Sequence, residues 1–182
     1  SETTKTTCCW TKLNCLETLK VAYNKLKSVP CQLARAKALT HIDASGNMLK
    51  TVPGCLGGLS KLQELRLQQN MLVDIPSDLF RVGSKLRVLH LSNNQITKLP
   101  SSIRHLTLVE DIRLANNELE ELPEEIGSCT KLVRLDLNHN NLKSLPASIG
   151  MLTSMSRLNV SHNDIADRLP KTLENCVELR EL

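Results

Sequence analysis

The prolines and asparagines of this chain recur at one shared interval, and that interval constrains the fold more than any other feature. The interval is 23 residues, lengthened to 24 in two places. All the prolines of the chain belong to the series Pro30, Pro53, Pro76, Pro100, Pro123, Pro146 and Pro170. The matching asparagines are Asn24, Asn47, Asn70, Asn94, Asn117, Asn140 and Asn163. Two unrelated residue types with one period indicate a tandem repeat, in which each unit stacks on the next.

Apolar residues fall into columns when the chain is aligned on this period. We number each repeat from its first apolar column, so that positions 1, 4, 6 and 11 are apolar, position 9 is the asparagine and position 15 is the proline. The alternation around positions 3 to 7 predicts a short strand with one buried face, stacked in parallel about 4.8 Å from its neighbour. The asparagine amide is expected to turn the chain and satisfy buried backbone groups. Proline then begins a return segment, predicted as a short helix or 3₁₀ turn.

The repeat L-x-x-L-x-L-x-x-N-x-L-x-x-L-P resembles the leucine-rich repeat family across almost the whole chain. The resemblance implies an α/β solenoid, a horseshoe with a parallel concave β-sheet and short helical or 3₁₀ convex segments. We expect seven full repeats beginning at residues 16, 39, 62, 86, 109, 132 and 155, with a truncated eighth at 179. Residues 1–15 are expected to be a flanking segment, a degenerate repeat or a cap. The chain stops inside the eighth repeat without a polar cap, so we expect it to be an excerpt from a longer protein.

The segments 99–106 and 145–152, which share the pattern L-P-x-x-I-x-x-L, are similar to the intracellular subclass of Scribble-type scaffolds, Ras suppressor proteins and fungal adenylyl cyclase. This resemblance implies a protein-interaction scaffold, with a small GTPase or signalling enzyme as the kind of partner. It also implies no catalytic activity, no cofactor and an intracellular, cytoplasmic location.

Two cysteines are predicted to be buried free thiols. Cys129 and Cys176 fall in an apolar column that also holds Val82, so they are expected to pack as small hydrophobic residues.

The other cysteines were weighed as disulfide partners. Cys31 and Cys55 follow prolines on the convex return and are expected to be unpaired. A cluster near the N-terminus contains Cys8, Cys9 and Cys15. It does not match the spaced cysteines of the family's secreted cap, and a zinc site there would lack a nearby fourth ligand. A reducing compartment is therefore expected, with the oxidation state of the cluster left open.

The concave strand face is the predicted partner-binding surface, because its residues vary between repeats while the leucines do not. Positions 3, 5, 7 and 8 point away from the core in this interpretation. The predicted protein-binding residues are His41, Asp43, Glu64, Arg66, Gln68, Gln69, His90, Asn93, Asp111, Arg113, Asn116, Arg134, Asp136, His139, Arg157, Asn159 and His162. Most binding energy is expected to come from a minority of them.

Catalytic and metal-binding alternatives are weaker. His139 and His162 occupy position 8 of adjacent repeats and are expected to be neighbours, but two ligands with a third from Asp136 or Asp164 make a poor metal site. Ser161 lies beside His162 in sequence, and neighbours on one strand and turn cannot converge as a catalytic triad. Asn159, Val160 and Ser161 form an N-glycosylation sequon. A glycan on a mid-strand residue of the concave face would block binding, so we do not expect glycosylation there.

Composition and charge exclude other classes. The sequence contains no run of 18 consecutive apolar residues, so no membrane-spanning segment is expected. The net charge is +4, with a basic first third and an acidic middle. The basic third lacks the interleaved aromatic residues that stack nucleic-acid bases, so no nucleic-acid partner is expected. Two alternatives to an intracellular scaffold remain open: a ligand-recognising receptor ectodomain, and a targeting domain fused to a phosphatase, kinase or ubiquitin ligase.

Overall fold

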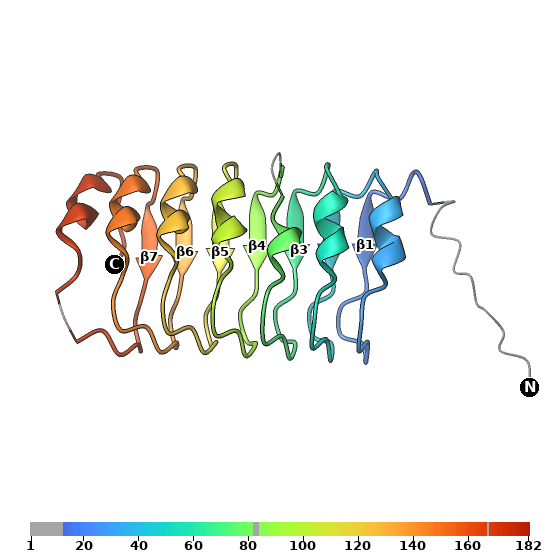
Figure 1. The fold of residues 1–182 in the computed structure, drawn as a ribbon, viewed down its shortest axis with the longest axis horizontal. Helices are drawn as coiled ribbons and strands as arrows, with labels where there is room; N and C mark the ends of the chain where they lie inside the picture. Colours follow the sequence, from blue (N-terminus) through green and yellow to red (C-terminus); the bar gives the residue numbers. More distant parts are fainter. Residues whose placement is uncertain (1–12, 82–83, 167) are drawn as a thin grey trace, which may run out of the picture.

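The computed structural model describes residues 13–81, 84–166 and 168–182 and shows an open solenoid with one strand per repeat (Figure 1). The seven strands form one parallel sheet in the order of the sequence. Each strand covers positions 3 to 5 of its repeat and pairs with the same positions of the next, which confirms the predicted register. The strands are β1 (Thr18–Lys20), β2 (His41–Asp43), β3 (Glu64–Arg66), β4 (Val88–His90), β5 (Asp111–Arg113), β6 (Arg134–Asp136) and β7 (Arg157–Asn159).

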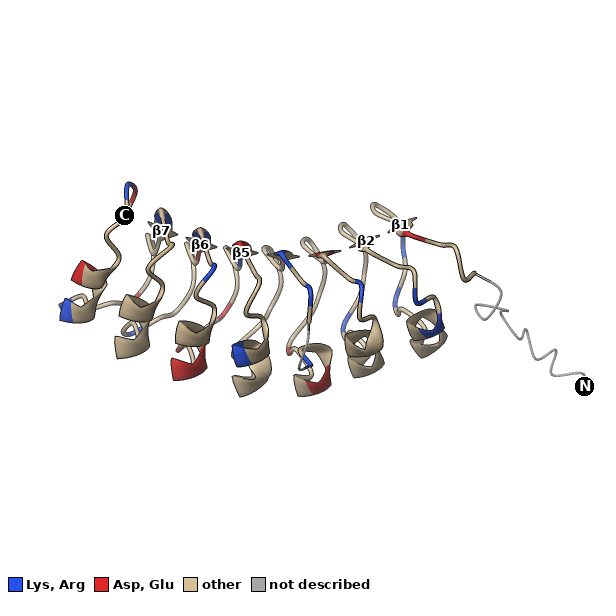
Figure 2. Cartoon of the chain, turned by 90° about the horizontal axis from the view of Figure 1, so that it is seen from above, with Lys and Arg blue, Asp and Glu red and all other residues tan. Residues whose placement is uncertain are grey.

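A 3₁₀ helix follows each proline, as predicted, with the proline at its N-terminal boundary. Figure 2 shows the sheet along one side of the solenoid and these helices along the other. The helices are η2 (Cys31–Arg35), η3 (Gly54–Gly58), η4 (Ser77–Leu79), η5 (Ser101–His105), η6 (Glu124–Ser128), η7 (Ala147–Met151) and η8 (Lys171–Asn175). Short 3₁₀ segments on one side and a continuous sheet on the other make the horseshoe that the repeat predicts.

The asparagines tie consecutive repeats together through their side-chain amides. Asn117 shows the arrangement: its Nδ2 donates to the carbonyl oxygens of Leu91 and Leu114, and its Oδ1 accepts from the backbone N–H of Ile96. Asn117 is only 8% exposed, and two of these partners belong to the preceding repeat. The amide thus satisfies backbone groups that the sheet leaves unpaired, as the sequence suggests.

The core is a single continuous row of leucine, isoleucine and valine side chains between the sheet and the helices. Its N-terminal end is thinner than the predicted columns imply. Leu26 is 37% exposed, and Leu16 and Leu19 are only partly buried, because no preceding described repeat covers them. Stacking on both sides, rather than the leucine itself, produces full burial.

The cysteines confirm one prediction and correct another. Cys129 and Cys176 are buried and free, and their thiols approach the carbonyl oxygens of the preceding repeat. The prediction that Cys31 and Cys55 are unpaired is wrong, because they form a disulfide across adjacent repeats with a Cα–Cα distance of 5.9 Å. Cys31 is position 16 of its repeat and Cys55 is position 17 of the next, so the two cysteines do not share a column and the repeat columns did not reveal the bond.

Parts of the predicted N-terminal cluster and of one apolar column lie outside the described residues. They are Cys8, Cys9 and Val82. Cys15 is described and is an exposed free thiol.

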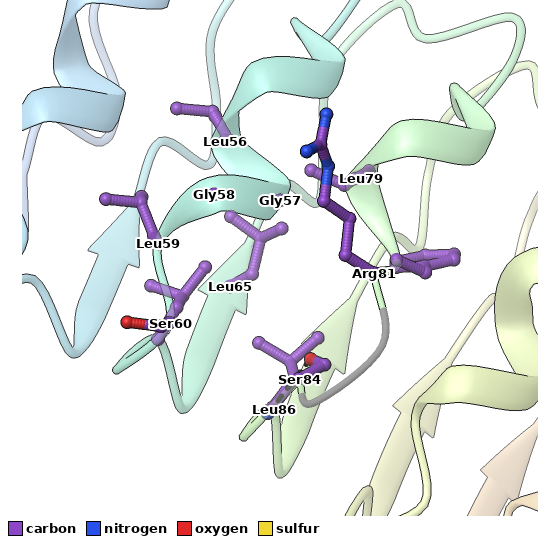
Figure 3. Close-up of a pocket in the computed structure, with 12 residues that line it drawn as sticks. Leu56, Gly57, Gly58, Leu59, Ser60, Leu65, Leu79, Arg81, Ser84 and Leu86 are labelled. Atoms are coloured by element: carbon purple, nitrogen blue, oxygen red, sulfur yellow. Dashed lines mark hydrogen bonds between the residues drawn. The ribbon is translucent and has the colours of Figure 1, made fainter.

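An apolar pocket of about 160 Å³ opens between η3 and η4, on the helical side of the molecule (Figure 3). Leu56, Leu79 and Leu86 are among the residues that line it, together with Arg81. Leu59 and Leu62, which also line the pocket, belong to the apolar columns of the core, so we assign the pocket no ligand.

Candidate protein-binding surface

The concave face is built from the exposed side of seven three-residue strands and the turns that follow them. Positions 3 and 5 alternate with the buried position 4, so their side chains stand on the open side of the sheet. Side chains from equal positions form rows across the sheet, because every strand pairs in register. The predicted residues of positions 3 and 5 are all brought onto this face.

Position 8 differs from the simple strand expected, because it lies beyond the strand end. Its residues have left-handed backbone conformations, with φ between 53° and 62° in all seven repeats. Asn and Gly tolerate this conformation best, which explains Gly46 and Asn93 here. A side chain added at Gly46 would also collide with the ring of Tyr23 from the preceding repeat. Position 8 therefore presents its side chains at the rim of the concave face.

The rim holds the pair of histidines that the sequence places side by side. The rings of His139 and His162 stack with centroids 4.1 Å apart and planes within 6°. Among the described residues, no group of three His, Cys, Asp or Glu side chains is arranged to hold a metal ion. Neither Asp136 nor Asp164 joins the pair as a third ligand.

Asp111 organises the centre of the concave face. Its Oδ2 lies 2.9 Å from Nη2 of Arg113, 3.4 Å from Nε2 of His90 and 3.8 Å from Nη1 of Arg134. Burial acts to raise the pKa of Asp111, but the nearby imidazole of His90, the hydrogen bonds from Arg113 and the attraction of their charges outweigh it and lower the pKa to about 2. The same ion pair raises the pKa of Arg113. Asp111 is therefore ionised throughout the neutral range and holds three strands together.

His90 is the predicted contact residue whose position differs most from expectation. It lies on the concave face but is only 8% exposed. It therefore positions Asp111 and offers a partner little surface of its own. The sequence shows that position 5 faces outward but not how deeply a given side chain is covered.

A hollow lies on each side of this central cluster. The N-terminal hollow, of about 380 Å³, contains Lys20, His41 and Arg66 in its lining. His41 lies 3.9 Å from Glu64, and Arg66 forms an ion pair with the same carboxylate. Both hollows are shallow and polar, which suits contact with side chains of another protein rather than enclosure of a small molecule.

The C-terminal hollow, of about 230 Å³, is lined by Arg134, Asp136 and Arg157 together with Glu181. Glu181 lies 3.3 Å from Arg157 and is absent from the predicted set. The repeat register identifies it, because residue 181 is position 3 of the truncated eighth repeat, and its backbone bridges to Arg157.

The remaining predicted residues accompany these two hollows along the same face. The side chains of Asp43 and Asn159 contact the turns that follow their own strands, since the Oδ1 atom of each accepts hydrogen bonds from a serine two residues later. Gln68 is half-buried, whereas Gln69 and Asn116 are exposed at the rim. The face is thus one continuous polar surface, with the ion-paired cluster of Asp111 at its centre and a more accessible hollow on either side.

No described helix is both long enough and apolar enough to cross a lipid bilayer.

Comparisons with known proteins agree with this architecture. A family model described as a leucine-rich repeat region matches residues 77–182, and one described as a leucine-rich repeat matches residues 14–72. No curated protein sequence matches the chain.

Two solved structures resemble the chain over most of its length. A leucine-rich repeat protein of Leptospira interrogans is 29% identical with a TM-score of 0.55, and the match covers 92% of this chain and 54% of that one. The plant peptide hormone receptor RGFR1, solved in complex with RGF2, is 30% identical with a TM-score of 0.83, covering 94% of this chain and 28% of the receptor. The chain thus spans about half or less of each of these proteins. The two family matches together cover nearly all of the repeats, and the chain belongs to the leucine-rich repeat family.

Proposed function

We propose that the chain is a non-catalytic protein-binding module whose concave face holds a protein partner. The observation that carries this proposal is the arrangement around Asp111. A scaffold that repeats every 23 residues presents a row of individual polar side chains, fixed at the centre by ion pairs and open in a hollow on either side. A preorganised, exposed and non-repeating surface on a repeating scaffold suits recognition of another macromolecule. We propose no catalytic role.

One charge reversal in each hollow tests the proposal. Arg66 and Arg157 line different hollows, and their side chains are 41% and 54% exposed, respectively. The double variant Arg66→Glu/Arg157→Glu leaves the Asp111 cluster intact. Lys61→Glu/Lys131→Glu is the matched control, because it makes the same charge change at exposed turns that precede the strands.

Affinity capture by the wild type and both variants, read by quantitative mass spectrometry, compares the surfaces directly. We expect a partner that the wild type and the control retain and the concave variant loses by tenfold or more. Equal capture by all three proteins would reject the concave face. Circular dichroism and urea unfolding verify that each variant is folded.

The nature of the partner separates two forms of this function. The subclass pattern of the sequence favours an intracellular scaffold for a small GTPase or signalling enzyme. The Cys31–Cys55 disulfide favours the ligand-recognising ectodomain instead, since disulfides persist mainly in oxidising compartments. The resemblance to a plant peptide hormone receptor is consistent with that second form. Thiol counting on protein isolated from its native cells distinguishes them: two fewer thiols than cysteines supports the ectodomain, and a full count supports the intracellular scaffold.

A further inference from the structure

A second exposed surface lies on the extended segment between each asparagine and the next proline. Positions 10 and 12 are exposed there, and in repeats 2 to 6 they flank a buried position 11. Backbone hydrogen bonds hold these segments in register between neighbouring repeats. Examples are the bonds from Met71 N to Leu49 O at 2.9 Å and from Gln95 N to Leu72 O at 2.8 Å. We call positions 10 and 12 of repeats 1 to 5 the flank. It is separate from the strand positions that form the concave face.

The residues of the flank change in character along the solenoid. Repeat 1 is basic, the middle is largely apolar, repeat 4 is neutral and polar, and repeat 5 is acidic. From repeat 1 to repeat 5, the pairs at positions 10 and 12 are Lys25 and Lys27, Met48 and Lys50, Met71 and Val73, Gln95 and Thr97, and Glu118 and Glu120.

The apolar middle of the flank is open to solvent. Met48 is 42% exposed, Met71 is 36% exposed and Val73 is 50% exposed. Methionine is enriched at protein interfaces, and a contiguous exposed apolar patch with polar neighbours marks an interaction site. The patch needs an occupant that is apolar at its centre and charged on either side.

The chain itself supplies that occupant. A second copy placed antiparallel, with a two-fold axis at repeat 3, brings repeat 1 of each copy opposite repeat 5 of the other. Lys25 then faces Glu118, Lys27 faces Glu120, and Met71 of one copy meets Met71 of the other. A parallel pair would set lysine against lysine. We propose that the flank is a self-complementary interface through which two copies of this chain associate antiparallel.

The size of the flank implies a weak dimer. Five segments about 4.8 Å apart span about 19 Å, which is small for a specific interface. Exposed ion pairs contribute little individually. Asp74, at position 13 of repeat 3, is exposed near the axis. In the dimer it would approach Asp74 of the other copy, and the repulsion between the two carboxylates weakens the association further. Association is therefore expected at high micromolar concentration.

Two charge-reversal variants test the pairing. Lys25→Glu/Lys27→Glu makes both ends of the flank acidic, and Glu118→Lys/Glu120→Lys makes both ends basic. Each variant alone opposes like charges at both ends of an antiparallel dimer. Mixed together, the two variants place opposite charges at both ends again. Lys61→Glu/Lys131→Glu, away from the flank, is the matched control.

Sedimentation equilibrium of residues 1–182 measures the outcome from about 10 µM to about 1 mM, the range of weak complexes. We expect the wild type and control to dimerise, each flank variant to associate at least tenfold more weakly, and the equimolar mixture to regain association. A wild-type monomer throughout this range overturns the proposal, as does a dimer that the reversals leave unchanged or a mixture that stays monomeric. A monomer that binds polyglutamate through Lys25 and Lys27 also overturns it and assigns the flank to a separate acidic partner.

Discussion

Nε2 of His90 lies 3.4 Å from Oδ2 of Asp111 on the neighbouring strand, which places an imidazole and a carboxylate together in the covered centre of the concave face. The pKa of Asp111 is about 2 in the folded chain, below the value of about 3.9 expected when unfolded. A depressed carboxyl pKa stabilises the fold above the unfolded pKa and loses that effect as the pH falls through the folded pKa. The window is therefore about pH 4 down to pH 2.

Asp111→Asn should reduce the free energy of unfolding by about 2 kcal/mol at pH 7. The wild type should approach the variant in stability as the pH falls through that window, because protonation removes the same charge. Urea unfolding at several pH values measures both effects. Asp136→Asn is the control on the next strand, with an expected loss below about 0.5 kcal/mol. Parallel stability curves for wild type and Asp111→Asn would contradict the assignment.

The asparagine ladder should be far more sensitive inside the solenoid than at its start. Asn117→Ala leaves the buried N–H of Ile96 without its acceptor. It also removes one of the two amide donors to the carbonyls of Leu91 and Leu114, which keep those of Asn94 and Asn140. We expect a loss of about 2 kcal/mol in the free energy of unfolding.

Asn24→Ala provides the matched control. Among the described residues, the side chain of the exposed Asn24 bonds only to carbonyl oxygens of its own repeat, Val21 and Ala22. Its loss should be below about 1 kcal/mol in the same urea experiment. Equal losses for the two variants would show that the ladder does not link the repeats energetically.

Glycines on the helical side differ in how closely the next repeat approaches them. A Cβ atom at Gly150, in η7, would collide with the backbone carbonyl oxygen of Thr172 in η8. Gly150→Ala should therefore reduce the unfolding free energy by about 1–3 kcal/mol. At Gly58 the nearest atom to such a Cβ is Nζ of Lys37, at 3.7 Å, so Gly58→Ala should be neutral or slightly stabilising. Thermal unfolding of both variants checks the contrast, and a neutral Gly150→Ala would contradict it.

The period predicted the strands, their register, the proline-initiated helices and the role of the asparagines, because each depends on spacing along one repeat. It could not predict features that depend on contacts between particular repeats. The burial of His90 results from the individual side chains beside it. The disulfide results from two cysteines at nearly equal positions of adjacent repeats, where the columns gave no signal. Glu181 was accessible to sequence reasoning through its register and was missed because the eighth repeat is truncated.

The five described cysteines should fall into three classes of reactivity in protein purified without reductant. Cys15 is an exposed free thiol, whereas burial raises the pKa of Cys129 to about 12 and also raises the pKa of Cys176. The thiolate is the reactive form, so an alkylating reagent at pH 8 should label Cys15 in the native protein and leave Cys129 and Cys176 unlabelled until denaturation.

Cys31 and Cys55 form the third class, because they should resist labelling even in denaturant until a reductant is added. Peptide mapping by mass spectrometry follows each cysteine separately. Cys31→Ser/Cys55→Ser is the control, and it should lower the free energy of unfolding by about 3 kcal/mol, since the bond closes a loop between residues 24 apart. Reductant should lower the stability of the wild type by a similar amount and leave the double variant unchanged. Labelling of Cys31 and Cys55 without reductant would instead show that these thiols are unpaired, as the repeat columns predict. That result would also support the expected reducing compartment.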